Sequence, residues 1–144
     1  MSVDEEYAPS PSDWVREQVE EFERSGGTAA TTLRGTDMPV VVMTMRGHKS
    51  GKIRKVPVMK VEHDGVYAAV ASQGGAPTHP LWYHNLLADP DVTLQDGTVS
   101  GRYAAREVHG EEKALWWQRA VAAFPNYAQY QARTEREIPL LLLE

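Results

Sequence analysis

Residues 54–71 have the sequence RKVPVMKVEHDGVYAAVA, which gives the clearest indication of the fold. Two valine-containing runs, 54–62 and 66–71, flank the turn His63-Asp64-Gly65, whose Asp-Gly pair favours a tight hairpin. A second Asp-Gly turn, Gln95-Asp96-Gly97, separates the candidate strands 92–95 and 99–108. The pattern predicts an antiparallel sheet assembled from hairpins.

The remaining segments place helices outside this sheet. Regular strand-helix-strand alternation is missing, which excludes a parallel nucleotide-binding sheet. We therefore expect an α+β fold, a small closed or split β-barrel with an N-terminal helix and peripheral helices. The further candidate strands are 40–45 and 138–143, which makes five or six short strands in all, and the candidate helices are 13–24, 80–88, 110–123 and 127–133.

Length and composition indicate one globular domain. The chain has 144 residues, of which 42% are hydrophobic, and no cysteine, so disulfides, thiolate metal sites and cysteine nucleophiles are excluded. Residues 1–11 contain two prolines and little apolar surface, and we expect a flexible arm there before a single domain over 12–144. Apolar runs too short to span a bilayer and an acidic start predict a cytoplasmic protein.

The first predicted helix has an apolar stripe formed by Trp14, Val15, Val19 and Phe22, and it is polar elsewhere. Core packing would account for this stripe. The alternative is a weak peripheral membrane contact through this helix, with Trp14 and Phe22 in the lipid interface. The acidic residues of the helix disfavour docking on an anionic membrane.

The charge distribution is uneven. The chain carries 15 Lys+Arg and 20 Asp+Glu, a net charge of −5, yet residues 46–60 contain six cations and no carboxylate. This basic window attracts anions on a protein that otherwise repels them, which favours a small polyanionic ligand over nucleic acid. A solvated charge run on a hairpin is the alternative.

Two motif tests exclude common chemistries. The basic loop GHKSGK at 47–52 has three residues between its glycines and Ile53 after its lysine, so it is not a phosphate-binding P-loop. His79 and His84 are five residues apart in a predicted helix and align poorly for a metal, so no metal site is expected. No nucleophile elbow supports a Ser-His-Asp triad.

Small residues follow the predicted strand 66–71, in the sequence ASQGGA at 71–76. Such residues allow a flat ring to lie against the backbone. The helix after Pro80 then supplies Leu81, Trp82 and Tyr83 as an aromatic wall, and Asn85 as an amide for a carbonyl or imide edge. Packing of Trp82 and Tyr83 into the core is the alternative.

Several blocks occur together in a recognisable order: RGHKSG at 46–51, Arg54 with Pro57, ASQGG at 71–75, HPLWYHN at 79–85, and Tyr127 and Tyr130 before Ile138-Pro139. From about residue 30 to the C-terminus the chain resembles the deazaflavin-dependent nitroreductase family, in the A-type branch of the flavin/deazaflavin oxidoreductases.

The resemblance implies a split β-barrel related to the FMN-binding pyridoxamine-phosphate oxidases, and coenzyme F420 as cofactor. It implies hydride transfer from reduced F420 (F420H2) to a small electron-poor acceptor: a quinone, a nitroaromatic, or an unsaturated lactone such as a coumarin or aflatoxin. An FMN-dependent reductase of the same fold, or a non-catalytic F420-binding carrier, are the alternatives. A monomer or weak homodimer is expected, with no nucleic-acid partner.

We also predict roles for individual residues, and the resemblance implies the contacts with the coenzyme. Ser72 would donate to the developing oxyanion of the acceptor, while Tyr127 and Tyr130 flank the substrate as catalytic residues. The substrate pocket would contain Met59, Phe124 and Tyr130. Contacts to the acidic tail of F420 fall on His48, Lys49, Ser50, Arg54, Lys55, Val56 and Pro57, and contacts to its ring on Val70, Ala71, Ser72, Gln73, Leu81, Trp82, Tyr83, His84, Asn85 and Tyr127.

Three positions depart from the family pattern. His48 stands where many relatives have arginine, which replaces a permanent cation by a titratable one. Met59 and Phe124 stand where nitroimidazole-activating members often have tyrosine. The more apolar pocket favours quinone or lactone reduction over nitroimidazole turnover.

Overall fold

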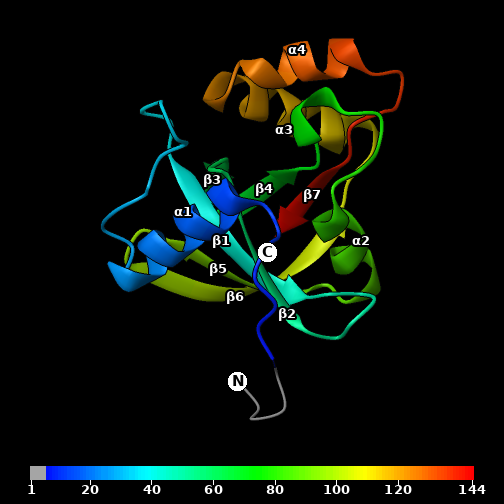
Figure 1. Ribbon diagram of the computed structural model, residues 1–144. Helices are drawn as coiled ribbons and strands as arrows, with labels where there is room; N and C mark the ends of the chain where they lie inside the picture. Colours follow the sequence, from blue (N-terminus) through cyan, green and yellow to red (C-terminus); the bar gives the residue numbers. More distant parts are fainter. Residues whose placement is uncertain (1–5) are drawn as a thin grey trace.

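The computed structural model describes residues 6–144. In this part of the chain seven strands form one antiparallel sheet in the order β2-β1-β5-β6-β7-β4-β3 (Figure 1). The strands are β1 (Val40–Arg46), β2 (Ile53–Met59), β3 (Glu62–His63), β4 (Val66–Val70), β5 (Asp91–Asp96), β6 (Val99–Glu107) and β7 (Leu140–Leu143). The helices are α1 (Asp13–Arg24), α2 (Leu81–Ala88), α3 (Gly110–Ala123) and α4 (Asn126–Arg133), with a single 3₁₀ turn, η1 (Gln73–Gly75).

The connection between β2 and β3 requires the sheet to curl. These two strands are the opposite ends of the strand order, yet only Lys60 and Val61 separate them in the chain. The three steps from Met59 to Glu62 span about 11 Å at most. The two ends of the sheet must therefore approach each other, and the sheet forms a half-barrel. The predicted α+β split-barrel fold with an N-terminal helix and peripheral helices is confirmed.

The same connection corrects one predicted strand. Residues 54–62 are not continuous: β2 pairs with β1 along its whole length, whereas β3 pairs with β4 at only two positions. The chain changes partner at Lys60, whose N–H donates to the Pro39 carbonyl at 3.0 Å, and at Val61, whose carbonyl accepts from Ala68 at 2.8 Å. The predicted turn at Gln95-Asp96-Gly97 does join β5 to β6 as an antiparallel hairpin.

The strand β7 lies at the centre of the core. All four of its leucines are buried, and they alternate between two apolar clusters. Leu140 and Leu142 pack with residues of α3 and α4, whereas Leu141 and Leu143 pack with residues of β1 and β5. Because β7 is buried on both faces, four consecutive leucines form a strand here. A strand with one exposed face would alternate apolar and polar residues. The helices α3 and α4 lie together over this end of the sheet (Figure 1).

The helix α1 has the predicted bounds and packs against β2. Val19 and Phe22 are buried against Val42, so the core-packing alternative holds for this half of the stripe. Of the predicted flexible arm, residues 1–5 lie outside the described residues, and residues 6–8 lie along Ile53, which exchanges backbone hydrogen bonds with Glu6 and Ala8. Within residues 6–144 no helix combines the length and apolarity needed to cross a bilayer.

Candidate active site

A cavity of about 630 Å³ lies between β2, the 70–74 segment, α1, α2 and α4. Its volume is in the range of pockets that hold small molecules and cofactors. The sequence-predicted site residues that line it are Arg54, Lys55, Val56, Pro57, Met59, Val70, Ser72, Gln73, Leu81, Trp82, Asn85, Phe124, Tyr127 and Tyr130. The others, His48, Lys49, Ser50, Ala71, Tyr83 and His84, are not part of its lining.

Six consecutive residues of β2, 54–59, line the cavity because β2 is an edge strand. The N–H and carbonyl of Ile53 point away from β1 and bond to residues 6–8. Groups two residues apart on a strand point the same way, so the backbone groups of Lys55 and the carbonyl of Pro57 also face this open edge. Proline fits there because its missing N–H removes no bond to β1.

Three hydroxyl groups on the cavity wall have no hydrogen-bond partner among residues 6–144: those of the buried Ser72 and Tyr127 and that of the partly buried Tyr130. Ser72 follows β4 and is 7% exposed, and Tyr127 on α4 is 3% exposed; both line the cavity. Burial raises the pKa of the Tyr127 phenol, and the nearby Tyr130 raises it further. Tyr127 therefore keeps its proton at neutral pH and is a hydrogen-bond donor rather than a proton source.

The wall around these hydroxyls is apolar and aromatic. The rings of Phe124 and Tyr127 meet edge to face with centroids 5.0 Å apart, and Tyr130 lies 6.3 Å from Tyr127. Met59 and Phe124 are both buried. The two tyrosines lie one helical turn apart on α4, so the predicted shared face is present and both side chains reach the same cavity.

The basic window at 46–60 is partly neutralised in the fold. Lys52 pairs with Glu6 at 3.0 Å, Lys55 with Glu23 at 2.6 Å and Lys60 with Asp96 at 2.9 Å. Two cations of the window, Lys49 and Arg54, make no ion pair with any residue in 6–144. Arg54 lines the cavity, and Lys49 is exposed on the adjoining turn.

The turn after β1 is tied to α2 through one amide. The Oδ1 of Asn85 accepts from the backbone N–H of His48 at 3.0 Å and lies 2.6 Å from the His48 Nδ1. Because the amide oxygen only accepts, Nδ1 is the donor and carries a hydrogen. The predicted pairing of Asn85 with a ligand carbonyl is therefore left to its Nδ2 group.

Two residues of α2, Tyr83 and His84, lie outside the cavity lining and have different surroundings. Tyr83 donates to the Glu107 carboxylate at 2.6 Å, which fixes α2 to β6. Burial and this hydrogen bond raise the pKa of Tyr83 to about 12. His84 is exposed, and its ring lies 5.9 Å from that of His48.

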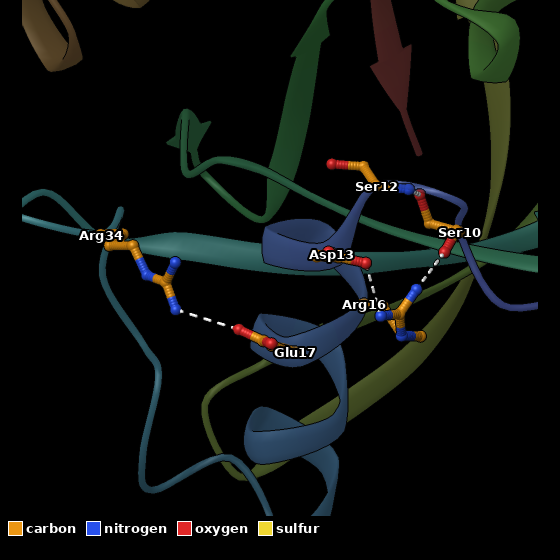
Figure 2. A network of polar contacts seen from close by, with 6 residues as sticks. All are labelled: Ser10, Ser12, Asp13, Arg16, Glu17 and Arg34. Carbon is orange, nitrogen blue, oxygen red and sulfur yellow. Dashed lines mark hydrogen bonds and ion pairs between the residues drawn. The ribbon is translucent and has the colours of Figure 1, made fainter.

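The sequence analysis did not assign the N-terminal side of the cavity, formed by Ser10, Pro11, Trp14, Val15 and Leu33. The start of α1 is fixed there by Arg16, which donates to the Ser10 carbonyl at 3.2 Å and to Asp13 at 2.7 Å (Figure 2). The ion pair of Arg34 with Glu17 joins the following loop to the same helix (Figure 2). The apolar stripe of α1 is the sequence feature that indicates this side of the cavity. Its first half faces the cavity, and its second half faces the core.

Gly74 and Gly75 differ in the space that a Cβ atom would have. A Cβ at Gly75 would come within 2.7 Å of the Tyr130 carbonyl oxygen, and its φ is +81°, whereas a Cβ at Gly74 meets nothing within 4 Å and its φ is +64°. We expect Gly75→Ala to lower the free energy of unfolding by about 3 kcal/mol, from backbone strain and overpacking together. Gly74→Ala, the matched control, should cost about 1 kcal/mol from strain alone. Denaturant titration of both variants measures the difference, and equal losses would contradict the close approach to α4.

His79 is held neutral next to Arg136. Burial lowers the pKa of His79, followed by the charges of Arg136 and His84, while Glu107 opposes the shift and Tyr83 packs on the ring at 4.8 Å. Because the folded pKa lies below the unfolded one, the unfolded chain binds more protons here, so stability falls as the pH drops below about 6.5. We expect His79→Gln to flatten the decrease in Tm between about pH 7 and about pH 5. Parallel profiles for the wild type and His79→Gln would contradict this.

No cluster of three or more His, Cys, Asp or Glu side chains suited to a metal occurs in residues 6–144. The cavity instead combines an apolar aromatic wall, three donor hydroxyls and a cationic end. These are features of a site for a large, flat, acidic organic molecule.

Comparison with known proteins agrees with this geometry. The sequence profile of the F420H(2)-dependent quinone reductase family matches residues 14–144. A Mycobacterium tuberculosis protein named F420H(2)-dependent quinone reductase is 35% identical over 108 residues, 73% of this chain and 72% of that protein. The chain belongs to this family. The predicted resemblance, the class of F420H2-dependent oxidoreductase and the coenzyme F420H2 are confirmed at the level of the family.

Two solved structures are similar along most of the chain. One, titled F420-H2 dependent reductase (FDR-A), is 50% identical with a TM-score of 0.71, and covers 78% of this chain and 99% of its own. Another, described as a domain-swapped dimer, is 49% identical with a TM-score of 0.73, and covers 94% of this chain and 100% of its own.

Proposed function

We propose that this protein reduces a quinone with F420H2 inside the 630 Å³ cavity. The observation that supports this best is the pairing of two unpartnered donor hydroxyls, Ser72 and Tyr127, with the apolar wall of Met59 and Phe124. A quinone presents two carbonyl oxygens on a flat apolar ring, so it needs donors in an otherwise apolar slot.

The residues present fit the coenzyme. The 70–74 segment and Trp82 offer a flat wall for the ring, and the open edge of β2 offers the backbone groups of Lys55 and Pro57. Arg54 lies at the cavity and Lys49 outside it, which provides charge for a phosphate and for the carboxylates beyond it. Reduced deazaflavin, when bound, supplies the hydride.

The protein supplies position, donors and a dry surface. Ser72 and Tyr127 donate to the acceptor oxygen on which negative charge develops. Because burial raises the pKa of Tyr127, this phenol stabilises the oxyanion without giving up its proton, and water delivers the final proton. Met59, Phe124 and Tyr130 exclude water from the other side of the acceptor.

Acceptor choice follows from the same wall. Met59 and Phe124 carry no hydroxyl, so this wall has fewer hydrogen-bond donors for a nitro group than a wall with tyrosines at the two positions. The donors that remain are enough for a quinone carbonyl. We expect quinones and unsaturated lactones to be reduced at least about tenfold faster, by kcat/KM, than bicyclic nitroimidazoles. Reoxidation of F420H2, followed by its absorbance against a panel of the three acceptor classes, tests this order.

The same assay separates the alternatives. Tight F420 binding without reoxidation by any acceptor would favour the carrier function. Reduction driven by reduced FMN but not by F420H2 would favour the FMN enzyme. Phe124→Tyr, which returns a hydroxyl to the wall, should raise nitroimidazole turnover relative to the wild type, and its failure to do so would remove the basis of the proposed preference.

Cellular location, membrane contact and oligomeric state stay predictions. Trp14 is 43% exposed and Leu81 is 61% exposed, and both line the cavity, so its rim includes exposed apolar side chains. This rim supports entry of a lipophilic acceptor. Of the two residues predicted for a weak membrane contact through α1, Trp14 is exposed and supports that contact, whereas Phe22 is buried and the prediction was wrong for it.

A further inference from the structure

Arg136, between α4 and β7, makes hydrogen bonds that are concentrated on one distant segment. Its Nε donates to the Ala76 carbonyl at 2.8 Å, its Nη2 to the Ser72 carbonyl at 2.6 Å, and its Nη1 to the Ala71 carbonyl at 3.2 Å. The same Nη1 lies 2.9 Å from the His79 Nδ1, which must accept because a guanidinium only donates. The guanidinium is thus bound to the beginning and the end of the 71–76 segment.

This contact takes the place of an ion pair. Arg136 makes no ion pair with any carboxylate among residues 6–144, although its side chain is partly buried and desolvation lowers its pKa. A buried cation is stabilised when its donors find acceptors, and here three backbone carbonyls and the His79 ring nitrogen accept from the guanidinium. A planar group with five N–H donors can reach carbonyls in several directions at once, which a lysine ammonium cannot.

The 71–76 segment needs such support. Gln73, Gly74 and Gly75 have φ values of +46°, +64° and +81°, so three consecutive residues are left-handed and no regular ladder continues β4. Two local bonds remain, from Gly75 N–H to the Ser72 carbonyl and from Ala76 N–H to the Gln73 carbonyl. A left-handed glutamine costs about 1–2 kcal/mol unless its surroundings hold it.

Arg136 itself is fixed to the core. Gln131 on α4 donates to the Arg136 carbonyl at 2.9 Å and accepts from the N–H of buried Ile138 at 2.9 Å. Pro139 then accepts from Ala71 at 2.9 Å at the start of β7. The guanidinium therefore holds the segment that carries Ser72 at a defined place relative to α4, which carries Tyr127 and Tyr130.

We propose that Arg136 is a positioning residue for the reductase: it holds the 71–76 segment so that the Ser72 hydroxyl and the α4 tyrosines face the same acceptor. This inference rests on the proposed role of Ser72. It assigns Arg136 no contact with coenzyme or acceptor, since Arg136 does not line the cavity.

Amide hydrogen exchange in the coenzyme-free protein tests the structural half. In Arg136→Met, which keeps the apolar stem, the amides of Gly75 and Ala76 should exchange at least about tenfold faster, while those of β1 and β7 keep their rates. Arg119→Met is the matched control, because Arg119 stacks on Trp116 at 4.6 Å on α3 and has no contact with the segment. Unchanged exchange in Arg136→Met would overturn the proposal. If that variant does not fold, Arg136→Lys provides the same measurement.

A double-mutant cycle tests the functional half. Arg136→Met should lower kcat about tenfold, and adding Ser72→Ala to it should lower kcat by less than about threefold more, because both changes remove the same donor. Multiplicative losses would overturn the link to Ser72. Added guanidinium should restore protection and turnover in Arg136→Ala, and ammonium should not. If the wild type reduces no acceptor, the proposed function fails, while the exchange measurement still decides the role of Arg136 in the segment.

Discussion

Lys49→Ala combined with Arg54→Ala is expected to weaken F420 binding about 100-fold. These are two cations of the basic window that have no carboxylate partner in residues 6–144, so their charge is available to the phosphate and carboxylates of the coenzyme. Two charge-assisted hydrogen bonds of about 1.5 kcal/mol each give this factor. Because the lost contacts are ionic, the residual affinity should also depend less on salt.

Quenching of F420 fluorescence at several salt concentrations measures both effects. Lys52→Ala combined with Lys60→Ala is the matched control, since it removes the same charge from the same window but from lysines that pair with Glu6 and Asp96. The control should change affinity less than about threefold, the size of a weak long-range charge effect. Equal losses in the two double variants would mean that the net charge of the window, rather than a defined tail site, binds the coenzyme.

The sequence predicts the local parts of this site well. Ser72 and Gln73 follow a strand, and Leu81 follows a proline that starts a helix, so propensity and turn chemistry place them on the loop and the helix where they are found. Spacing of three residues likewise puts Tyr127 and Tyr130 on one face of a short helix.

Contacts between distant residues are what the sequence pattern does not contain. The split of strand 54–62 at Lys60 depends on which strand each part pairs with, and no glycine, proline or other turn residue marks that point in the sequence. Glu23 lies 32 residues before Lys55, and Arg136 lies 64 residues after Ser72. No periodicity links such pairs, so neither the neutralised part of the basic window nor the support of the 71–76 segment could be predicted.

Ser72→Ala is expected to lower kcat with a quinone about tenfold while the Kd for F420 changes less than about threefold. The hydroxyl has no partner among residues 6–144 and lines the cavity, so its removal leaves no buried group unsatisfied and opens little space. The loss is smaller than for an isolated oxyanion donor because Tyr127 remains as a second one. Tyr127→Phe should therefore show a loss of similar size, since burial raises the pKa of Tyr127 and makes it a donor only.

The combination of the two variants separates a shared oxyanion site from two unrelated effects. If both hydroxyls donate to the same oxygen, the double variant should lose more than the product of the single losses, because the second donor no longer compensates for the first. Stopped-flow reoxidation of F420H2 measures the hydride step directly, and fluorescence titration measures coenzyme affinity in the same preparations. A parallel fall in affinity and turnover in Ser72→Ala would assign this serine to coenzyme binding, because a group that acts only on the developing oxyanion changes the rate and leaves the ground-state complex intact.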